Sequence, residues 1–277
     1  KTAGLHTVVY EIGGTAGNIA YGLSLLGEKP LILATICRDY HRYFDWLTKN
    51  HISHDGIRII EEELTAGAYI TTDQADNQIT GFNPGAMKFA SAFDFSKISS
   101  RESIAIIAPG NLEDMMNYSA VYKSKGIDYI FDPGQSLPIW NSPDLIKCID
   151  GSRIMISNDY ELELIISKTG LDKKKLLQRT RSIVTTLGEF GSRVSTQEFE
   201  IDIPAIKPKD VVDPTGAGDA YRAGLIQGLV QNLNLKQSAE MGSACASFAV
   251  ECYGTQEHFF SQMDFKKRLA TLPISNR

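Results

Sequence analysis

Residues 211–220 have the sequence Val211-Val212-Asp213-Pro214-Thr215-Gly216-Ala217-Gly218-Asp219-Ala220. Val211 and Val212 predict the end of a strand, because the proline and first glycine that follow prevent its continuation. The apolar run over 220–229 predicts a helix that begins at the acid Asp219. A strand, a glycine-bearing turn and a helix in this order predict an α/β fold with a binding site at the start of the helix.

The turn itself predicts an anion site. The N–H groups of Gly216, Ala217 and Gly218 precede the helix and lack partners within it, and the helix dipole favours negative charge at the same place. A carboxylate beside an anion is unfavourable unless it has a chemical task. Asp219 is therefore interpreted as a general base that takes a proton from a nucleophile. The alternative is that Asp219 only caps the helix and the glycines only turn the chain.

The octapeptide 213–220 matches, residue for residue, the C-terminal signature of the ribokinase-like (PfkB) family of sugar and nucleoside kinases. The resemblance implies that the backbone of Gly216, Ala217 and Gly218 forms the anion hole for the transferred phosphoryl group. It implies that Asp219 deprotonates the acceptor hydroxyl, with Thr215 beside the nucleotide.

A second glycine turn lies near the start of the chain. The β-rich run 7–12 stops at Gly13-Gly14, and apolar positions at helical spacing predict a helix over 15–26. Glycines at this junction let the backbone approach a ligand, and Asn18 can present an amide to a hydroxyl. The alternative is a simple turn with a surface asparagine. The pattern resembles the N-terminal signature of the same family, which implies that Gly13, Gly14 and Asn18 contact the acceptor sugar.

A β-hairpin is predicted next, from the runs 68–72 and 78–82 separated by a polar segment. With 7–12 it can form a small antiparallel sheet, and the family carries such a sheet as a lid over the acceptor. We expect the lid to comprise about 5–13 and 64–85. Phe82 either packs within the hairpin or contacts the substrate.

From residue 103 onward strands and helices alternate regularly, which predicts a doubly wound, mostly parallel sheet flanked by helices. With the lid, this is the ribokinase-like fold, and we expect 1–277 to form one kinase domain. Predicted strands end at Asp132, Asn158 and Thr186. Ligands bind at the carboxyl ends of such strands. The resemblance implies acceptor binding for Asp132.

Two further motifs follow these strand ends. Asn158 and Glu161 have the spacing of a helix-capping box, and also resemble the family's Asn-x-x-Glu motif, which implies that Asn158 binds the nucleotide and Glu161 holds Mg²⁺ through water. Thr186, Gly188 and Gly191 form a hairpin turn by themselves. They resemble the family's Thr-x-Gly-x-x-Gly, which lies along the nucleotide triphosphate.

The bulk composition excludes several other classes. A formal charge of −5 from 28 basic and 33 acidic residues, interspersed along the chain, gives no basic footprint for nucleic acid and no polybasic patch for a membrane. No apolar run is long enough to span a bilayer, so we expect a cytoplasmic protein. Four widely spaced cysteines argue against a zinc site or a disulfide framework and are expected to be buried thiols.

The sequence departs from the family at its start. Family members open with one more strand, which carries a Gly and an acceptor-binding Asp, and nothing corresponding precedes Lys1. A sheet without that central strand would expose a long apolar edge. We therefore expect the preceding residues to be omitted from the sequence.

The resemblance implies an ATP-dependent, Mg²⁺-requiring kinase, with room for a monovalent cation as a further cofactor. Segments 73–87 and 131–135 look most like the family's nucleoside kinases, which favours the 5′-hydroxyl of adenosine or a related purine nucleoside. A free sugar such as ribose is the alternative acceptor, and a nucleoside-binding sensor without turnover is the alternative from another class. A homodimer through the lid is a further expectation from the family.

Overall fold

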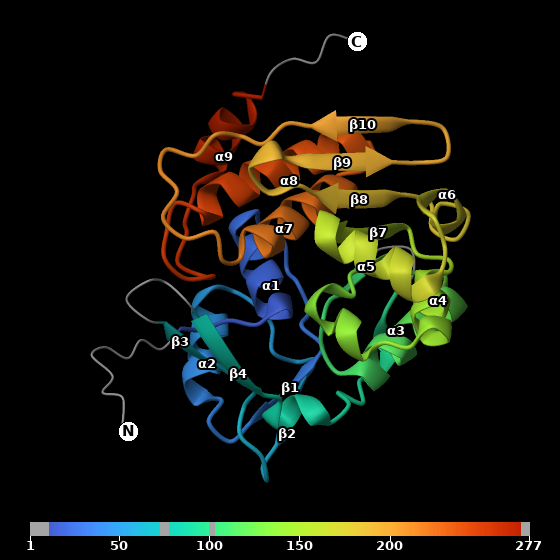
Figure 1. Ribbon diagram of the computed structural model, residues 1–277. Coiled ribbons are helices and arrows are strands. Elements are labelled where there is room, and N and C mark those ends of the chain that lie inside the picture. Colours follow the sequence, from blue (N-terminus) through green and yellow to red (C-terminus); the bar gives the residue numbers. More distant parts are fainter. Residues whose placement is uncertain (1–10, 73–77, 100–102, 273–277) are drawn as a thin grey trace.

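The computed structural model describes residues 11–72, 78–99 and 103–272. Its centre is a six-stranded sheet with the order β10-β9-β8-β7-β6-β5 (Figure 1). Strands β5 to β8 are parallel to one another, whereas β9 and β10 are antiparallel additions at one edge. The strands of the sheet are β5 (Ile104–Ile107), β6 (Asp128–Phe131), β7 (Ile154–Asn158), β8 (Ile183–Thr186), β9 (Ser192–Ser195) and β10 (Glu200–Ile203).

Helices cover both faces of this sheet. One face carries α1 (Thr15–Leu25), α7 (Ala217–Val230) and α8 (Leu235–Ala249), and their apolar side chains form one core with Ile130, Ile156 and other strand residues. The opposite face packs a second core. Its helices are α3 (Leu112–Lys125), α4 (Ser142–Ile149), α5 (Asp159–Thr169) and α6 (Lys173–Leu176). The last helix, α9 (Gln262–Leu269), packs on α8 through Phe248, Phe260 and Phe265.

Close packing of α7 on α8 depends on small residues at their contact. A Cβ added at Gly224 would lie 2.3 Å from the carbonyl oxygen of Met241, and one at Gly228 would lie 2.5 Å from the Cα of Ser238. No side chain fits at these separations. The two helices therefore approach backbone to backbone, which fixes the direction of α7 and the place of its N-terminus.

The chain between α1 and β5 forms two further two-stranded sheets. β1 (Ala34–Cys37) and β2 (Ile57–Ile60) make a two-stranded parallel sheet, and α2 (His41–Lys49) lies between them in sequence. β3 (Gly67–Thr72) and β4 (Gln78–Asn83) form the antiparallel hairpin that the sequence predicts. The predicted lid run 7–12 lies almost entirely outside the described residues.

Most of the expected alternation is present, and the expected fold class is confirmed. The interpretation of Val211 and Val212 as a strand end is wrong, because β10 ends at Ile203 and residues 204–214 form neither strand nor helix. Val211 is 71% exposed, and the N–H of Val212 donates to the carbonyl of Val250 at the end of α8. Prolines at 204, 208 and 214 lack the N–H that a ladder requires, so this segment cannot pair as a strand.

Within the apolar run 30–37, only Ala34–Cys37 is paired in a ladder. None of the four cysteines is in a disulfide, and three of them are buried, as expected. None of the helices in the described part of the chain has the length and apolar character needed to cross a bilayer.

Candidate active site

The N-terminus of α7 has the geometry of an anion site. α7 begins at Ala217, two residues before the acid, and Gly216 is its N-cap with φ 80°. This left-handed conformation favours glycine, and a Cβ there would also lie 3.1 Å from Thr255. Among the described residues, no hydrogen-bond acceptor faces the N–H of Gly216 or Gly218. The N–H of Ala217, expected to be free, instead donates to the carbonyl of Pro214 at 3.2 Å, because the chain closes a turn before the helix starts.

Asp219 lies in the first turn of α7, partly buried. Its Oδ2 accepts a hydrogen bond of 2.7 Å from the side-chain amide of Asn18 on α1, so the structure joins the two glycine motifs that lie 201 residues apart. Burial raises the pKa of Asp219 to about 6, while the Asn18 hydrogen bond and the charge of Arg222 lower it. A carboxylate with this pKa is ionised at neutral pH and is still basic enough to take a proton.

Arg222 is a site residue that sequence reasoning missed. Its Nε donates to Oδ2 of Asp132 at 2.5 Å, and its Nη1 donates to the carbonyl oxygen of Gly218 at 2.9 Å. Both ion-pair partners are buried, Asp132 being 1% exposed. Oδ1 of Asp132 has no hydrogen-bond partner among the described residues. The available signal was a lone cation in the apolar run after Asp219, because a charge there needs a buried partner.

The N-terminal glycines lie beside the same turn. Gly14 is the N-cap of α1 with φ 101°, and its carbonyl accepts the N–H of Asn18. Gly13 faces Thr255, whose hydroxyl donates to the carbonyl of Ile12. Thr255 therefore lies between the N-terminal turn and Gly216, and it holds the two glycine motifs at a fixed separation.

Asn158 and Thr186 are neighbours at the carboxyl edge of the sheet, where β7 and β8 pair them directly. Asn158 caps α5: its side chain accepts the N–H of Glu161, and the carboxylate of Glu161 accepts the N–H of Asn158 at 2.8 Å. The expected capping box is thus confirmed. Burial raises the pKa of Glu161, and Arg222 acts against that rise, so electrostatics couple Glu161 to the cluster around Asp132.

The turn after β8 requires its glycines. Gly188 has φ 58° with open space around its missing side chain, and Gly191 has φ 92° with the carbonyl oxygen of Ile203 only 2.1 Å from a built Cβ. Thr215 is exposed, and its N–H donates to Asp213. Burial acts to raise the pKa of Asp213, but hydrogen bonds from Thr215 and Gly254 outweigh it and hold that pKa below the usual value.

Phe82 is not part of this cluster. It lies on β4 of the hairpin, 56% exposed, opposite Ala68. The structure thus brings Gly13, Gly14, Asn18 and Asp132 to Asp219 and leaves Phe82 on the hairpin. Its predicted contact with the acceptor stays a prediction.

The residues fit a magnesium ion held mainly by phosphate and water. No group of three His, Cys, Asp or Glu side chains in the described residues could enclose a metal. Mg²⁺ bound with a nucleotide uses one or two protein carboxylates and keeps several waters. Glu161, near the carboxyl edge of the sheet, fits that requirement through its carboxylate oxygens.

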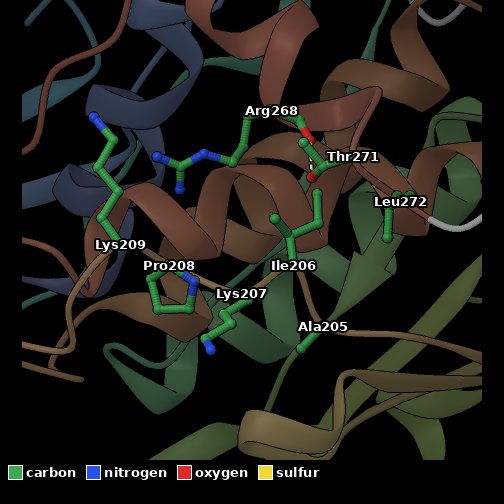
Figure 2. A pocket seen from close by; sticks show the side chains of 8 residues that line it. All are labelled: Ala205, Ile206, Lys207, Pro208, Lys209, Arg268, Thr271 and Leu272. Atoms are coloured by element: carbon green, nitrogen blue, oxygen red, sulfur yellow. Dashed lines mark hydrogen bonds between the residues drawn. The ribbon is translucent and has the colours of Figure 1, made fainter.

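A separate cavity of about 420 Å³ lies beside the segment that follows β10, and Figure 2 shows Lys207, Lys209 and Arg268 around it. Arg268 is already paired with Glu251 at 3.0 Å and stacks on Phe248. The cavity contains none of the residues of the Asp219 cluster. It is therefore not the site that the sequence motifs predict.

The fold and this cluster define a class of protein: an α/β phosphotransferase with a glycine turn and a buried carboxylate at one helix N-terminus. A family model described as "pfkB family carbohydrate kinase" matches residues 2–261. The chain belongs to this family, has its ribokinase-like fold, and is an ATP-dependent kinase.

Individual relatives agree with this assignment. The nucleoside kinase of Methanocaldococcus jannaschii is 34% identical over 247 residues, which cover 88% of this chain and 80% of the relative. The structure of Burkholderia thailandensis nucleoside kinase in complex with inosine has a TM-score of 0.89 at 31% identity, covering 98% of this chain and 89% of that one. The same enzyme in complex with ADP-inosine has a TM-score of 0.89 at 30% identity, covering 100% and 87%.

Proposed function

We propose that this kinase transfers the γ-phosphoryl group of ATP to the 5′-hydroxyl of a purine nucleoside, with adenosine or a related nucleoside as the acceptor. The observation that carries the site is the 2.7 Å hydrogen bond between Asn18 and Asp219. This bond joins Asn18, which contacts the acceptor in this proposal, to Asp219, which is its base. The nucleoside class is supported by the two similar enzymes named as nucleoside kinases, one of them bound to inosine.

The residues have distinct roles in this proposal. Gly13, Gly14 and Asn18 hold the ribose, and Oδ1 of Asp132, which has no partner among the described residues, accepts from an acceptor hydroxyl. Asp219 takes the proton of the 5′-hydroxyl as the phosphoryl group arrives. The N–H groups at Gly216 and Gly218 stabilise the charge on that group. Phosphoryl transfer is catalysed mainly by positioning and by such electrostatic stabilisation.

The nucleotide lies along the carboxyl edge of β7 and β8 in this proposal. Asn158, Thr186, Thr215 and the turn at Gly188 and Gly191 contact the triphosphate, and Glu161 holds Mg²⁺ through water. When bound, Mg²⁺ neutralises phosphate charge. A monovalent cation is a further part of this proposal. Because ATP is the donor, we place the enzyme in the cytoplasm.

A coupled ADP-release assay over nucleosides and free sugars tests the acceptor class. We expect turnover with purine nucleosides at acceptor concentrations where ribose gives none. Turnover with ribose alone would establish the sugar-kinase alternative. Nucleoside binding without ADP release from any acceptor would establish the sensor alternative.

The hairpin β3–β4 supports the proposed lid and a homodimer formed through it. Residues directly opposite in an antiparallel pair point to one face, so Ile70 and Phe82 share one face and Tyr69 and Ile79 the other. All four are exposed. One face can close over the acceptor while the other meets a second copy, and the molar mass in light scattering would fall to that of a monomer in Ile79→Lys.

A further inference from the structure

A buried chain of side-chain hydrogen bonds ends at the base. The indole nitrogen of Trp46 on α2 donates to Oε1 of Gln256 at 2.8 Å, and Nε2 of Gln256 donates to Oδ1 of Asn18 at 2.9 Å. Nδ2 of Asn18 then donates to Oδ2 of Asp219 at 2.7 Å. The four residues come from four separate parts of the sequence, so only the fold connects them.

The chemistry of the first residue fixes the direction of every bond in this chain. An indole N–H can only donate, so the amide of Gln256 must turn its oxygen towards Trp46 and its nitrogen towards Asn18. Asn18 must then accept with its oxygen, which leaves its nitrogen to face Asp219. A reversed amide at either position would place two donors or two acceptors against each other. The orientation of both amides therefore follows from the bonding pattern.

The hydrogen bonds of this chain are shielded from water, which strengthens them. Gln256 is 2% exposed and Asn18 is 6% exposed. Space for the amide of Gln256 depends on Gly17, because a Cβ there would lie 2.3 Å from the Tyr43 hydroxyl and 3.3 Å from Nε2 of Gln256. In such surroundings a hydrogen bond is stronger and an unmatched polar group is costly.

In the described part of the chain, two charged groups act on Asp219. Arg222 on the same helix favours its ionised form, and Asp132 at the end of β6 opposes it. Burial opposes ionisation most strongly, and the hydrogen bond from Asn18 is the largest contribution in the other direction. The direction in which Asn18 points is therefore important for keeping the base ionised.

We propose that Gln256, anchored by Trp46, is a positioning residue for phosphoryl transfer that holds the Asn18 amide with its N–H directed at Asp219. In this arrangement the base is kept ionised, and one of its oxygens is engaged while the other stays turned to the acceptor. The catalytic role of Asp219 rests on the proposed function. The direction of the hydrogen bonds from Trp46 to Asp219 is independent of that function.

The variant Gln256→Met keeps the length of the side chain but removes both hydrogen-bonding groups, Oε1 and Nε2, that link Trp46 to Asn18. Asn18 is then free to turn its oxygen to Asp219, and we expect the acid limb of the kcat/KM profile to move up by roughly half to one pH unit. Trp46→Phe should move it in the same direction by less. In the Gln256→Met background Trp46→Phe should add nothing, because both act through one chain.

Gln262→Met is the matched control. Gln262 is an exposed glutamine on α9, and within the described part of the chain its amide donates to the carbonyl of Leu25 alone. Its substitution should leave the acid limb in place. Should Gln256→Met fail to fold, Trp46→Phe alone provides the same test.

A second readout does not need turnover. The ¹³Cγ resonance of Asp219, identified by its loss in Asp219→Asn, should titrate at higher pH in Gln256→Met than in the wild type. A wild type without ADP release would contradict the proposed function and leave this titration measurable. An unmoved Asp219 titration in Gln256→Met, with kcat/KM lowered equally at every pH, would show that Gln256 is only structural.

Discussion

At the scale of single residues, Asp219 combines burial with a hydrogen-bond donor and a nearby cation. Burial raises the pKa, and Asn18 and Arg222 keep the rise moderate, at about 6. A base with a lower pKa would be a weaker proton acceptor, and one with a higher pKa would be protonated at neutral pH. The opposing contributions of neighbouring groups thus set the working range.

Asp219→Asn should separate the chemical role from a structural one. We expect kcat to fall by roughly 10² to 10⁴ with ATP binding retained, measured by steady-state kinetics and calorimetry. Because the folded-state pKa is raised above the unfolded value, ionising Asp219 reduces stability as pH rises from about 4 towards 6. The variant lacks this cost, so its Tm at pH 8 should equal or exceed that of the wild type. More than about a tenth of the wild-type kcat would rule out the base.

The same pKa predicts the pH profile of the wild type. Since the base must be ionised, kcat/KM should fall below a pH of about 6. Asp202→Asn, an exposed carboxylate paired with Arg193 on β9, is the control and should keep the wild-type profile. A profile that is flat down to pH 4 would mean that Asp219 is not the group whose ionisation limits the reaction.

At the scale of elements, α5 starts with a group that serves both the helix and the proposed metal. Glu161 closes the capping box with Asn158. Glutamine can take the position of Glu161 in a capping box, because Gln237 closes the equivalent box with Asn234 at the start of α8. The cap and the charge can therefore be separated by substitution.

Glu161→Gln should keep α5 capped while removing the carboxylate charge. We expect the Mg²⁺ concentration for half-maximal rate to rise roughly tenfold, with Tm little changed. Asp264→Asn, in the capping box of α9, is the control that alters a cap elsewhere. An equal Mg²⁺ dependence in the wild type and in Glu161→Gln would reduce Glu161 to a helix cap.

The N-cap of α1 allows a similar separation. Gly14 has φ 101° with no atom near a built Cβ, so Gly14→Ala introduces backbone strain and no clash. The strain should turn the first residues of α1 and displace Asn18, which raises the acceptor KM by about tenfold, more than the KM for ATP. Steady-state kinetics with each substrate varied in turn measures the difference.

Gly126→Ala is the matched control for that change. Gly126 ends α3 with φ 68° and is likewise surrounded by open space. Both variants should lose stability, Gly14→Ala more because its φ of 101° and ψ of 128° lie outside the left-handed helical region that Gly126 occupies, and only Gly14→Ala should affect the acceptor. Equal kinetic effects of the two would contradict the assignment of Gly14 to the acceptor site.

At the scale of the whole molecule, one buried histidine makes the stability of the fold depend on pH. His258 is 2% exposed, stands edge-on to Tyr21, and neither ring nitrogen has a hydrogen-bond partner among the described residues. Burial lowers its pKa to about 4. The folded protein therefore holds a neutral imidazole where the unfolded chain takes up a proton near pH 6.5.

This difference should weaken the fold in acid. Because the folded-state pKa is depressed, the stability is fully present above pH 6.5 and is lost as pH falls towards 4, by up to about 3 kcal/mol. His258→Phe should remove that part of the pH dependence, measured as the free energy of unfolding in urea at pH 4.5 and 7.5. His54→Phe, an exposed ring stacked on Phe44, is the control. Identical pH dependence in all three proteins would contradict this account.

The sequence by itself determined the alternation of strands and helices, the hairpin and the capping box at Asn158. These depend on local chemistry: apolar periodicity, prolines that lack an N–H, and side chains that reach a backbone three residues away. The glycine turn at the start of α7 was also predictable, because Pro214 and Gly216 stand directly before an apolar helix. The strand predicted at Val211 failed since pairing depends on a partner strand, which the local sequence does not specify.

Only the tertiary structure decided which distant groups meet. Arg222 could be seen as a lone cation in an apolar helix, but its partner Asp132 lies 90 positions away in sequence. The hydrogen-bond chain from Trp46 through Gln256 to Asn18 joins residues whose spacing in sequence follows no helical or strand period. Hydrogen bonds and ion pairs between buried side chains are set by how α1, α2 and α7 pack, and that packing is a property of the whole chain rather than of any one segment.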